Sequence, residues 1–157
     1  MKIKIENENV LYLKEKTKIL NKDGLKKLIQ KSKKTKNKSL RLCFHDNKKS
    51  NLHQMFIIHP RKYFVPPQYH PSKDESIFVI SGKARLNYFK KNGKIENKYI
   101  LDRGNFFHLI KKNKIHNLEI LSSIFIFLEI SLGPFKKDNT LYPKWFKNYK
   151  IINKQIS

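Results

Sequence analysis

The chain has 157 residues, of which 39% are hydrophobic and 12% aromatic, enough for one domain with a substantial core. This apolar content excludes a wholly disordered chain despite a formal net charge of +23. No apolar run is long enough to span a bilayer, and the first residues lack the apolar segment of a secretion signal. Cys43 is the single cysteine, so an internal disulfide is impossible and a reducing, cytoplasmic location is expected.

The positive charge is carried almost entirely by lysines, spread from Lys2 to Lys154. Arginine, the residue that forks onto phosphates and reads guanine edges, occurs only at positions 41, 61, 85 and 103. We therefore expect a lysine-coated surface and no nucleic-acid partner. The alternative, a basic nucleic-acid binder, depends on charge alone and would require DNA binding that weakens steeply with salt. Attraction for anionic substrates such as sugar nucleotides is compatible with both interpretations.

The first forty residues combine weak strand and helix patterns. Residues 1–20 alternate weakly and could form one or two strands. Asp23 lies in a break before the next element and is a candidate helix cap, and Leu25, Leu28 and Ile29 at i, i+3 and i+4 predict a short amphipathic helix ending near residue 34. The lysine-rich tract 31–39 lacks apolar periodicity and indicates a solvated connector.

From residue 40 the pattern changes to short β-like runs separated by turn residues. Strands without intervening helices predict a mainly β fold, an antiparallel sandwich or barrel, and Asn92-Gly93 predicts a hairpin. The predicted strands are 40–44, 54–59, 76–80, 84–89, 95–101, 106–110, 115–121 and 124–131. The tail from Gly133 is rich in aromatic residues and is expected to wrap the barrel as an extended arm; they are Phe135, Tyr142, Trp145, Phe146 and Tyr149.

Three residues could hold a metal ion. His70 is followed by Glu75 at the start of a predicted strand, and His116 lies on a later strand after the polar loop 111–114. Antiparallel barrel strands can bring such positions together at the barrel mouth. Two imidazoles and one carboxylate suit Fe(II), Mn, Ni or Zn, with positions left open for water or substrate. Alternatively, the three are polar residues of a mouth without an ion, although an unpaired buried carboxylate at Glu75 would be costly.

Two segments carry a resemblance to a known family. The stretch Pro67–Gly82, PQYHPSKDESIFVISG, is similar to the first cupin motif, in which HxH is followed by four residues, Glu, six residues and Gly. Ile110–His116 stands where the second motif, PxGxxH, is expected. More narrowly, roughly residues 22–146 resemble the WbuC family of cupin-fold metalloproteins. The further segments that carry this resemblance are Leu40–His45, His53–Phe56, Glu129–Phe135 and Tyr142–Trp145.

The resemblance implies a single cupin jelly-roll β-barrel with a short N-terminal helix and a C-terminal aromatic arm. Its parts would be an N-terminal strand and helix (1–39), the barrel (40–132) and the arm (133–157). The barrel would bind one divalent metal. Because cupins commonly pair through an N-terminal strand, residues 3–13 also suggest a homodimer.

Function follows from the same resemblance by analogy. WbuC-like genes are found among those for lipopolysaccharide O-antigen assembly, and related cupins isomerise or epimerise nucleotide-linked sugars. The expected function is therefore metal-dependent chemistry on a nucleotide-linked or lipid-linked sugar in lipopolysaccharide or capsule synthesis, with no general base evident in the sequence. The alternative is a non-catalytic cupin that binds a small carbohydrate or a partner protein and has a degenerate metal site.

Several residues depart from the family pattern. Gln68 replaces the first histidine of HxH, and its amide oxygen would be a poorer fourth ligand. Pro66 and Gln54 stand where the family usually carries arginine. The Pro-x-Gly turn before His116 is replaced, although Asn113 can adopt the left-handed conformation that such a turn needs. These departures favour the non-catalytic alternative.

Other residues are candidates for lining the mouth of the barrel rather than for binding metal. His108 alternates with apolar residues and could point inward, or it could be a hydrogen-bonded wall residue. Cys43 is expected to be a buried hydrophobe rather than a nucleophile. The remaining candidates for the mouth are His45, Tyr63 and Gln54.

Overall fold

Ten strands and one helix make up the described part of this computed structural model, which comprises residues 1–35, 39–61, 63–136 and 139–146. The elements are β1 (Ile3–Asn7), β2 (Val10–Leu13), α1 (Lys22–Ser32), β3 (Leu40–Cys43), β4 (Leu52–Pro60), β5 (Glu75–Ser81), β6 (Ala84–Phe89), β7 (Ile95–Leu101), β8 (Phe107–Ile110), β9 (Ile115–Ile120) and β10 (Ile124–Leu132). The mainly β fold predicted from the sequence is confirmed. α1 has 11 residues, and no helix in the described ranges is long and apolar enough to cross a membrane.

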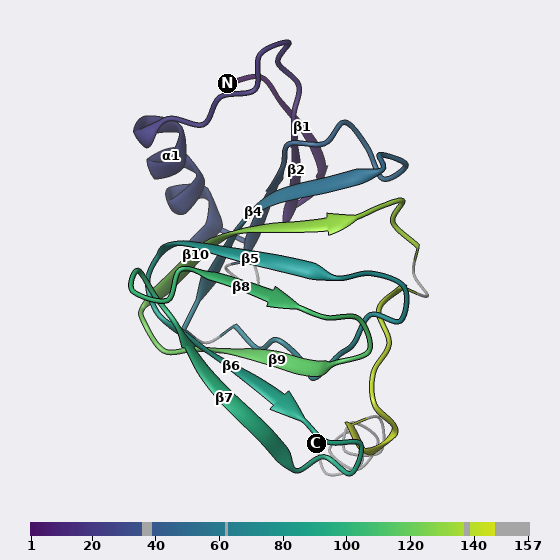
Figure 1. Cartoon of the computed structure of the whole chain (residues 1–157). Coiled ribbons are helices and arrows are strands. Elements are labelled where there is room, and N and C mark those ends of the chain that lie inside the picture. Colours follow the sequence, from purple (N-terminus) through teal and green to yellow (C-terminus); the bar gives the residue numbers. More distant parts are fainter. Residues whose placement is uncertain (36–38, 62, 137–138, 147–157) are drawn as a thin grey trace, which may run out of the picture.

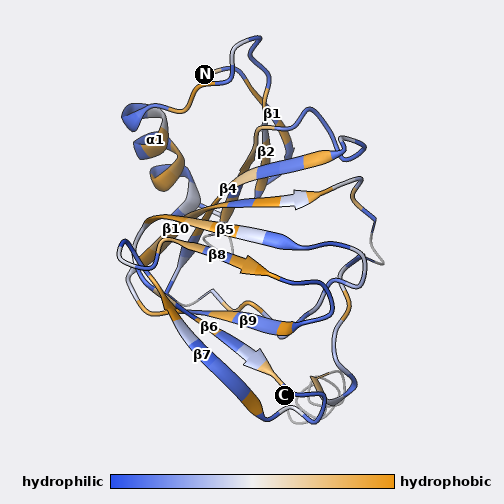
Figure 2. Ribbon diagram, in the orientation of Figure 1, coloured by the Kyte–Doolittle hydropathy of each residue, from blue (hydrophilic) through white to orange (hydrophobic). Residues whose placement is uncertain are grey.

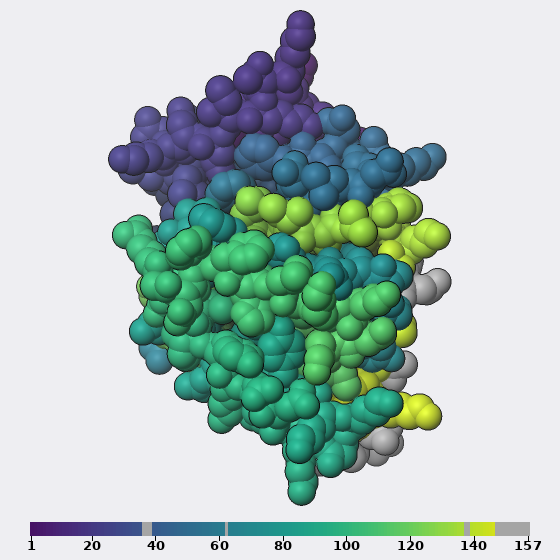
Figure 3. All heavy atoms as spheres, viewed as in Figure 1, coloured from purple at the N-terminus to yellow at the C-terminus, as the bar shows by residue number. Residues whose placement is uncertain are grey.

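The strands form two sheets (Figure 1). The large sheet has the order β1-β2-β3-β4-β10-β5-β8, and the small sheet has the order β7-β6-β9. Neighbouring strands are antiparallel except β2 and β3, which run parallel. Figure 3 shows the N-terminal third, in purple and blue, at one end of the molecule and the segments of the small sheet toward the other.

The main core lies between the two sheets. Strand alternation directs one face of β4, β5 and β10 toward the inner face of the small sheet. The large sheet contributes Ile57, Ile77, Val79, Phe125 and Phe127, and the small sheet contributes Ala84, Leu86, Leu101, Leu118 and Ile120. In the described residues the strands form two facing sheets rather than the closed barrel that was predicted, and we call the space between them the barrel interior. Cys43 is buried as expected, and burial raises the pKa of its thiol to about 11.

A second apolar cluster lies on the outer face of the large sheet, beneath α1. Leu28 of the helix packs against Leu42, Ile58 and Ile126 of three strands. The predicted helix is confirmed, but the prediction of Asp23 as its cap is wrong. Asn21 caps the helix, because its side chain accepts a hydrogen bond from the backbone N–H of Gly24 at 2.8 Å, whereas Asp23 lies within the first turn.

The C-terminal arm packs along the body of the chain. The ring of Trp145 lies 5.5 Å from that of Phe89, over Gly93 of the β6–β7 turn. Leu141 forms a backbone bridge with Tyr69, close to the candidate site. Tyr149 and the rest of 147–157 lie outside the described residues. β1 and β2, from the predicted N-terminal part, belong to the same sheet as strands of the predicted barrel. The division into three parts stays a prediction.

Gly82 in the β5–β6 turn is required by the backbone. Its φ is +90°, and a Cβ there would lie 2.2 Å from the carbonyl oxygen of Ile124. Gly82→Ala should therefore lower the free energy of unfolding by at least about 2 kcal/mol, measured by urea denaturation. Gly104→Ala is the control, because its Cβ would approach no atom closer than 3.3 Å; equal losses in both variants would contradict this explanation.

Candidate metal centre

Three buried side chains converge at one end of the barrel interior. His70 follows the bridge segment at 68–69, Glu75 begins β5, and His116 lies on β9. One potential ligand atom from each residue lies within 4.8 Å of the other two. Their relative exposures are 6%, 6% and 3%, so a buried carboxylate and two buried imidazoles share a small volume. Buried charge of this kind needs a compensating cation or proton.

Backbone carbonyls orient both imidazoles. Nδ1 of His70 lies 2.7 Å from the carbonyl oxygen of Asn139, and Nδ1 of His116 lies 2.9 Å from that of Lys114. Because a carbonyl oxygen can only accept, Nδ1 donates in both contacts. In the neutral rings Nε2 therefore keeps its lone pair, as it does in most metal-binding histidines.

The contact between His70 and Glu75 also fits a shared cation. Nε2 of His70 lies 2.9 Å from Oε2 of Glu75, yet this buried nitrogen has no well-aligned hydrogen bond. Two ligands of one ion, with bonds near 2.1 Å, would be about 3.0 Å apart in octahedral and about 3.4 Å apart in tetrahedral coordination. Burial alone raises the pKa of Glu75, but contact with a protonated His70 and the charge of a protonated His116 outweigh it, so the pKa lies below its usual value and the carboxylate is ionised. With neutral rings, a bound cation would supply this positive charge instead. The donor set therefore fits a divalent metal.

Gln68 lies beside His116. The two residues exchange backbone hydrogen bonds of 2.9 Å in an antiparallel bridge, and side chains of such opposed residues lie on the same side. Asn113 has the expected left-handed conformation, with φ of 65°, and its N–H donates to the carbonyl oxygen of His70. The replaced turn thus still links the His70 and His116 segments.

His108 forms part of the interior wall. Its Nε2 lies 2.8 Å from the hydroxyl of Tyr88 on the small sheet, and its ring lies 5.4 Å from that of Tyr99. Burial and the charge of His116 lower the pKa of His108, while burial raises that of Tyr88 to about 12. Both groups are therefore neutral near pH 7 and can exchange hydrogen bonds with a ligand.

Within the described residues, the other three candidates for the mouth do not contact the metal-centre cluster. His45 stacks on His53, with ring centroids 4.2 Å apart, and burial lowers the pKa of His45 to about 4. Gln54 is at an even position of β4, on the face opposite to the interior residue Ile57. Tyr63 stacks on His59 at 4.1 Å. No hydrogen bond, ion pair or ring contact found in the described ranges joins any of the three to the metal-centre cluster.

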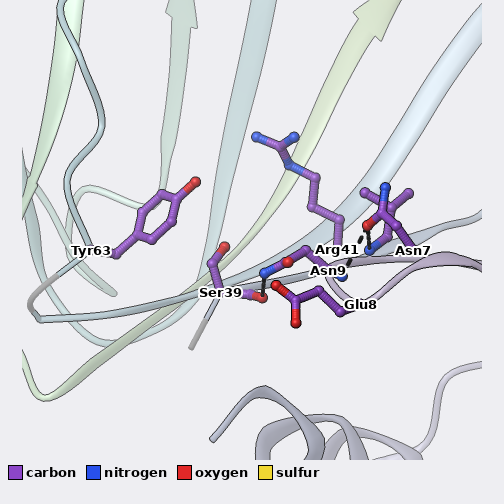
Figure 4. Close-up of a pocket in the computed structure, with 7 residues that line it drawn as sticks. Asn7, Glu8, Asn9, Ser39, Arg41 and Tyr63 are labelled. Carbon is purple, nitrogen blue, oxygen red and sulfur yellow. Dashed lines mark hydrogen bonds between the residues drawn. The ribbon is translucent and has the colours of Figure 1, made fainter. Parts of the chain in front are cut away.

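Tyr63 lines a separate pocket of about 460 Å³, which the sequence did not predict (Figure 4). The side-chain amide of Asn9 donates to the carbonyl oxygen of Ser39 at 2.7 Å and closes one wall. Arg41 forms no side-chain hydrogen bond or ion pair within the described ranges, so its guanidinium is available to an anionic ligand. The other lining residues are Asn7, Glu8 and Val10. The one available clue was a rare arginine inside an apolar strand.

Sequence reasoning also missed Glu129. On β10 it follows Phe125 and Phe127 on the same inward face, where it lies between Met55 of β4 and Ile77 of β5. Its half-buried carboxyl forms no hydrogen bond or ion pair in the described part of the chain. Burial and the charge of Glu75 raise its pKa to about 7. A lone acidic residue in an apolar, alternating run was the signal that could have identified it.

The two sheets and the inward-facing cluster define a cupin fold, and solved structures support this. The capsular polysaccharide assembling protein CapF from Staphylococcus aureus matches with a TM-score of 0.52 and 16% identity, over 65% of this chain and 32% of that chain. Oxalate decarboxylase from Lactobacillus farciminis matches with a TM-score of 0.51 and 15% identity, over 67% of this chain and 31% of that chain. The chain thus spans about a third of the length of either protein, and at such identities the likeness establishes the fold alone.

The family is established by sequence. A family model described as domain of unknown function DUF6016 matches residues 20–101, half of the chain, so the chain belongs to this family. A search of the curated proteins gave no match.

Proposed function

We propose that the chain is a WbuC-like cupin metalloprotein that binds one divalent ion through His70, Glu75 and His116. The observation that carries this proposal is the geometry of the two imidazoles, whose Nδ1 atoms donate to backbone carbonyls while a buried carboxylate adjoins them. Gln68, beside His116, would be a fourth ligand. The ion would be Fe, Mn, Ni or Zn, and when bound it would polarise a substrate carbonyl or hydroxyl.

We further propose that the protein acts in the cytoplasm as an isomerase or epimerase on a nucleotide-linked sugar in surface-polysaccharide synthesis. The resemblance to WbuC proteins supports this context, and CapF, with the same fold, is described as a capsular polysaccharide assembling protein. His108 and Tyr88, which share one hydrogen bond, would donate one hydrogen bond to a sugar hydroxyl and accept another, and Glu129 would exchange a proton at its carboxyl. The net charge of +23 would attract the anionic diphosphate.

A second candidate is a non-catalytic cupin that binds a small carbohydrate or a partner protein. Gln68 favours it, because this amide replaces a histidine of the cupin motif and binds metal less well than an imidazole. Both candidates are expected to act as homodimers.

Metal content tests the first proposal. Wild-type protein purified without a histidine tag should contain close to one equivalent of Fe, Mn, Ni or Zn by elemental analysis. His116→Ala should contain almost none, because only one imidazole, one carboxylate and the weaker amide of Gln68 would remain. His108→Ala is the matched control: it removes an imidazole from the same interior but not from the cluster, and it should retain the ion.

The outcomes separate the candidates. A metal-loaded wild type would justify screening sugar nucleotides for binding and for proton exchange with solvent. A wild type that remains metal-free after incubation with each ion would refute the metalloprotein and favour the binding protein. Equal loss from both variants would show that the fold, rather than the ligand set, had been damaged.

A further inference from the structure

The outer face of the large sheet carries no charged residue beyond the region that α1 covers. The strand register aligns four residues across β4, β10, β5 and β8: Phe56, Leu128, Phe78 and Phe107. Within each strand, residues two positions away from these lie on the same side of the sheet. The outward residues are Leu52, Gln54, Phe56, Ser76, Phe78, Phe107, Leu109, Leu128, Ile130 and Leu132. We call this set the outer face. In a chain with 30% charged residues, a four-stranded surface without charge is unusual.

Much of the outer face is exposed to solvent. Relative exposures are 57% for Phe107, 42% for Leu109 and 39% for Phe78. Phe106, exposed by 48%, extends the surface, since its ring lies 5.4 Å from that of Phe78. Figure 2 shows hydrophobic colour along most of β8, which is one of the two edge strands of the sheet.

The exposed area matches what a stable dimer requires. With Leu52 (46%) and Leu132 (60%), six large apolar side chains are at least 39% exposed on or beside the outer face. Each exposes on the order of 100 Å², so together they offer roughly 600 Å² of apolar surface. A specific interface buries about 800 Å² per partner, of which somewhat more than half is apolar. A patch of this size on a monomer commonly marks an interaction site.

We propose that the outer face joins two copies of this chain in an isologous dimer. A net charge of +23 on each copy opposes contact through any of the lysine-bearing surfaces, whereas the outer face lets the copies approach without opposing charges. Two sheets can stack face to face with their side chains interdigitated, and a two-fold axis places the same residues on both sides. This assignment rests on the homodimer of the proposed function and adds the surface that forms it, which needs neither a metal nor a substrate.

The outer face replaces residues 3–13 as the proposed dimer contact. β1 does present a free edge, but its exposed residues include the charged Lys4 and Glu6. Charged residues on an edge strand oppose pairing with another strand. Two such edges, each on a strongly basic chain, would form a weaker contact than two uncharged faces.

Sedimentation equilibrium on the full chain tests the dimer. Wild type should be dimeric at micromolar concentration, and Phe107→Glu should raise the dissociation constant at least about 100-fold, because it buries an unpaired carboxylate in an apolar interface. Leu109→Glu should act in the same way. Phe135→Glu is the matched control, since Phe135 is 52% exposed but is not part of the outer face. Circular dichroism should show that all variants fold, as expected for exposed positions.

Three results would overturn the proposal. One is a wild type that stays monomeric at high micromolar concentration. Another is a dimer that resists both Phe107→Glu and Leu109→Glu but is broken by changes in β1. The third is a monomer that sediments with phosphatidylserine vesicles and loses this binding in Phe107→Glu, which would make the face a membrane site.

Discussion

Glu75→Gln is expected to weaken divalent-metal binding by more than about 100-fold, since losing even an outer hydrogen-bond partner of a ligand costs 10–100-fold. The amide keeps the size of the side chain but removes the only carboxylate among the three clustered ligand atoms. Thermal unfolding of metal-free protein titrated with Mn²⁺, Ni²⁺ or Zn²⁺ would measure the change. At a metal concentration 100 times the dissociation constant, wild type should gain about 2.7 kcal/mol, a rise in Tm of about 5–10 °C.

The matched control for this experiment is Glu119→Gln. Glu119 lies on β9 with the ligand His116, but its carboxylate pairs with Arg85 on the exposed side of the sheet. This variant should show the full thermal shift of the wild type. If Glu75→Gln also retained the full shift, then Glu75 is not a ligand, and the ion binds elsewhere or without it.

Local sequence pattern was sufficient for the strands. Alternation in 84–89 and 95–101, with Asn92-Gly93 between them, predicted the β6–β7 hairpin because both signals depend on neighbouring residues. The parallel pairing of β2 with β3 was not predictable in this way, because the two strands are joined through α1 and a lysine-rich segment. The helix cap was misassigned by two residues, since both Asn21 and Asp23 have side chains suited to capping.

The residues of the candidate metal centre could not be predicted from local sequence pattern alone. The spacing of His70, Glu75 and His116 alone is weak, and the resemblance to the cupin motifs was what united them. The carbonyls of Asn139 and Lys114, which orient the imidazoles, carry no side-chain signal that a sequence could reveal. These hydrogen bonds to the imidazoles form only when distant backbone segments come together in the folded chain.

The position of Glu129 also could not be predicted from local sequence pattern. Its strand was predicted correctly, but an acidic residue in an apolar run can face either solvent or the interior. Only pairing with β4 and β5 shows that it follows Phe127 on the inner face. Arg41 is a similar case, because its place in a pocket depends on the β1–β2 turn and on Tyr63.

The environment of Glu129 leads to a pH-dependent expectation. Its pKa rises from the ordinary value of 4.5 to about 7, chiefly through burial and the charge of Glu75, while Arg41, Lys73 and His70 oppose the shift. The folded state therefore holds this proton more tightly than the unfolded chain does. The resulting stabilisation is complete below pH 4.5 and is lost as the pH rises through 7, because the carboxylate must then ionise inside the barrel.

Glu129→Gln should accordingly leave stability nearly unchanged at pH 4.5 and raise it at pH 8 by about 1–2 kcal/mol, after allowance for the partial exposure of the carboxyl. Urea unfolding of both proteins at the two pH values, with a chelator present, measures this difference. Other groups that titrate identically in the two proteins contribute equally to both free energies of unfolding, so they do not affect the difference. A gain that is equal at both pH values, or a loss at pH 8, would mean that Glu129 is ionised and well paired in the folded chain. Saturating metal should reduce the gain at pH 8, because a cation held by the neighbouring Glu75 would favour the ionised form of Glu129.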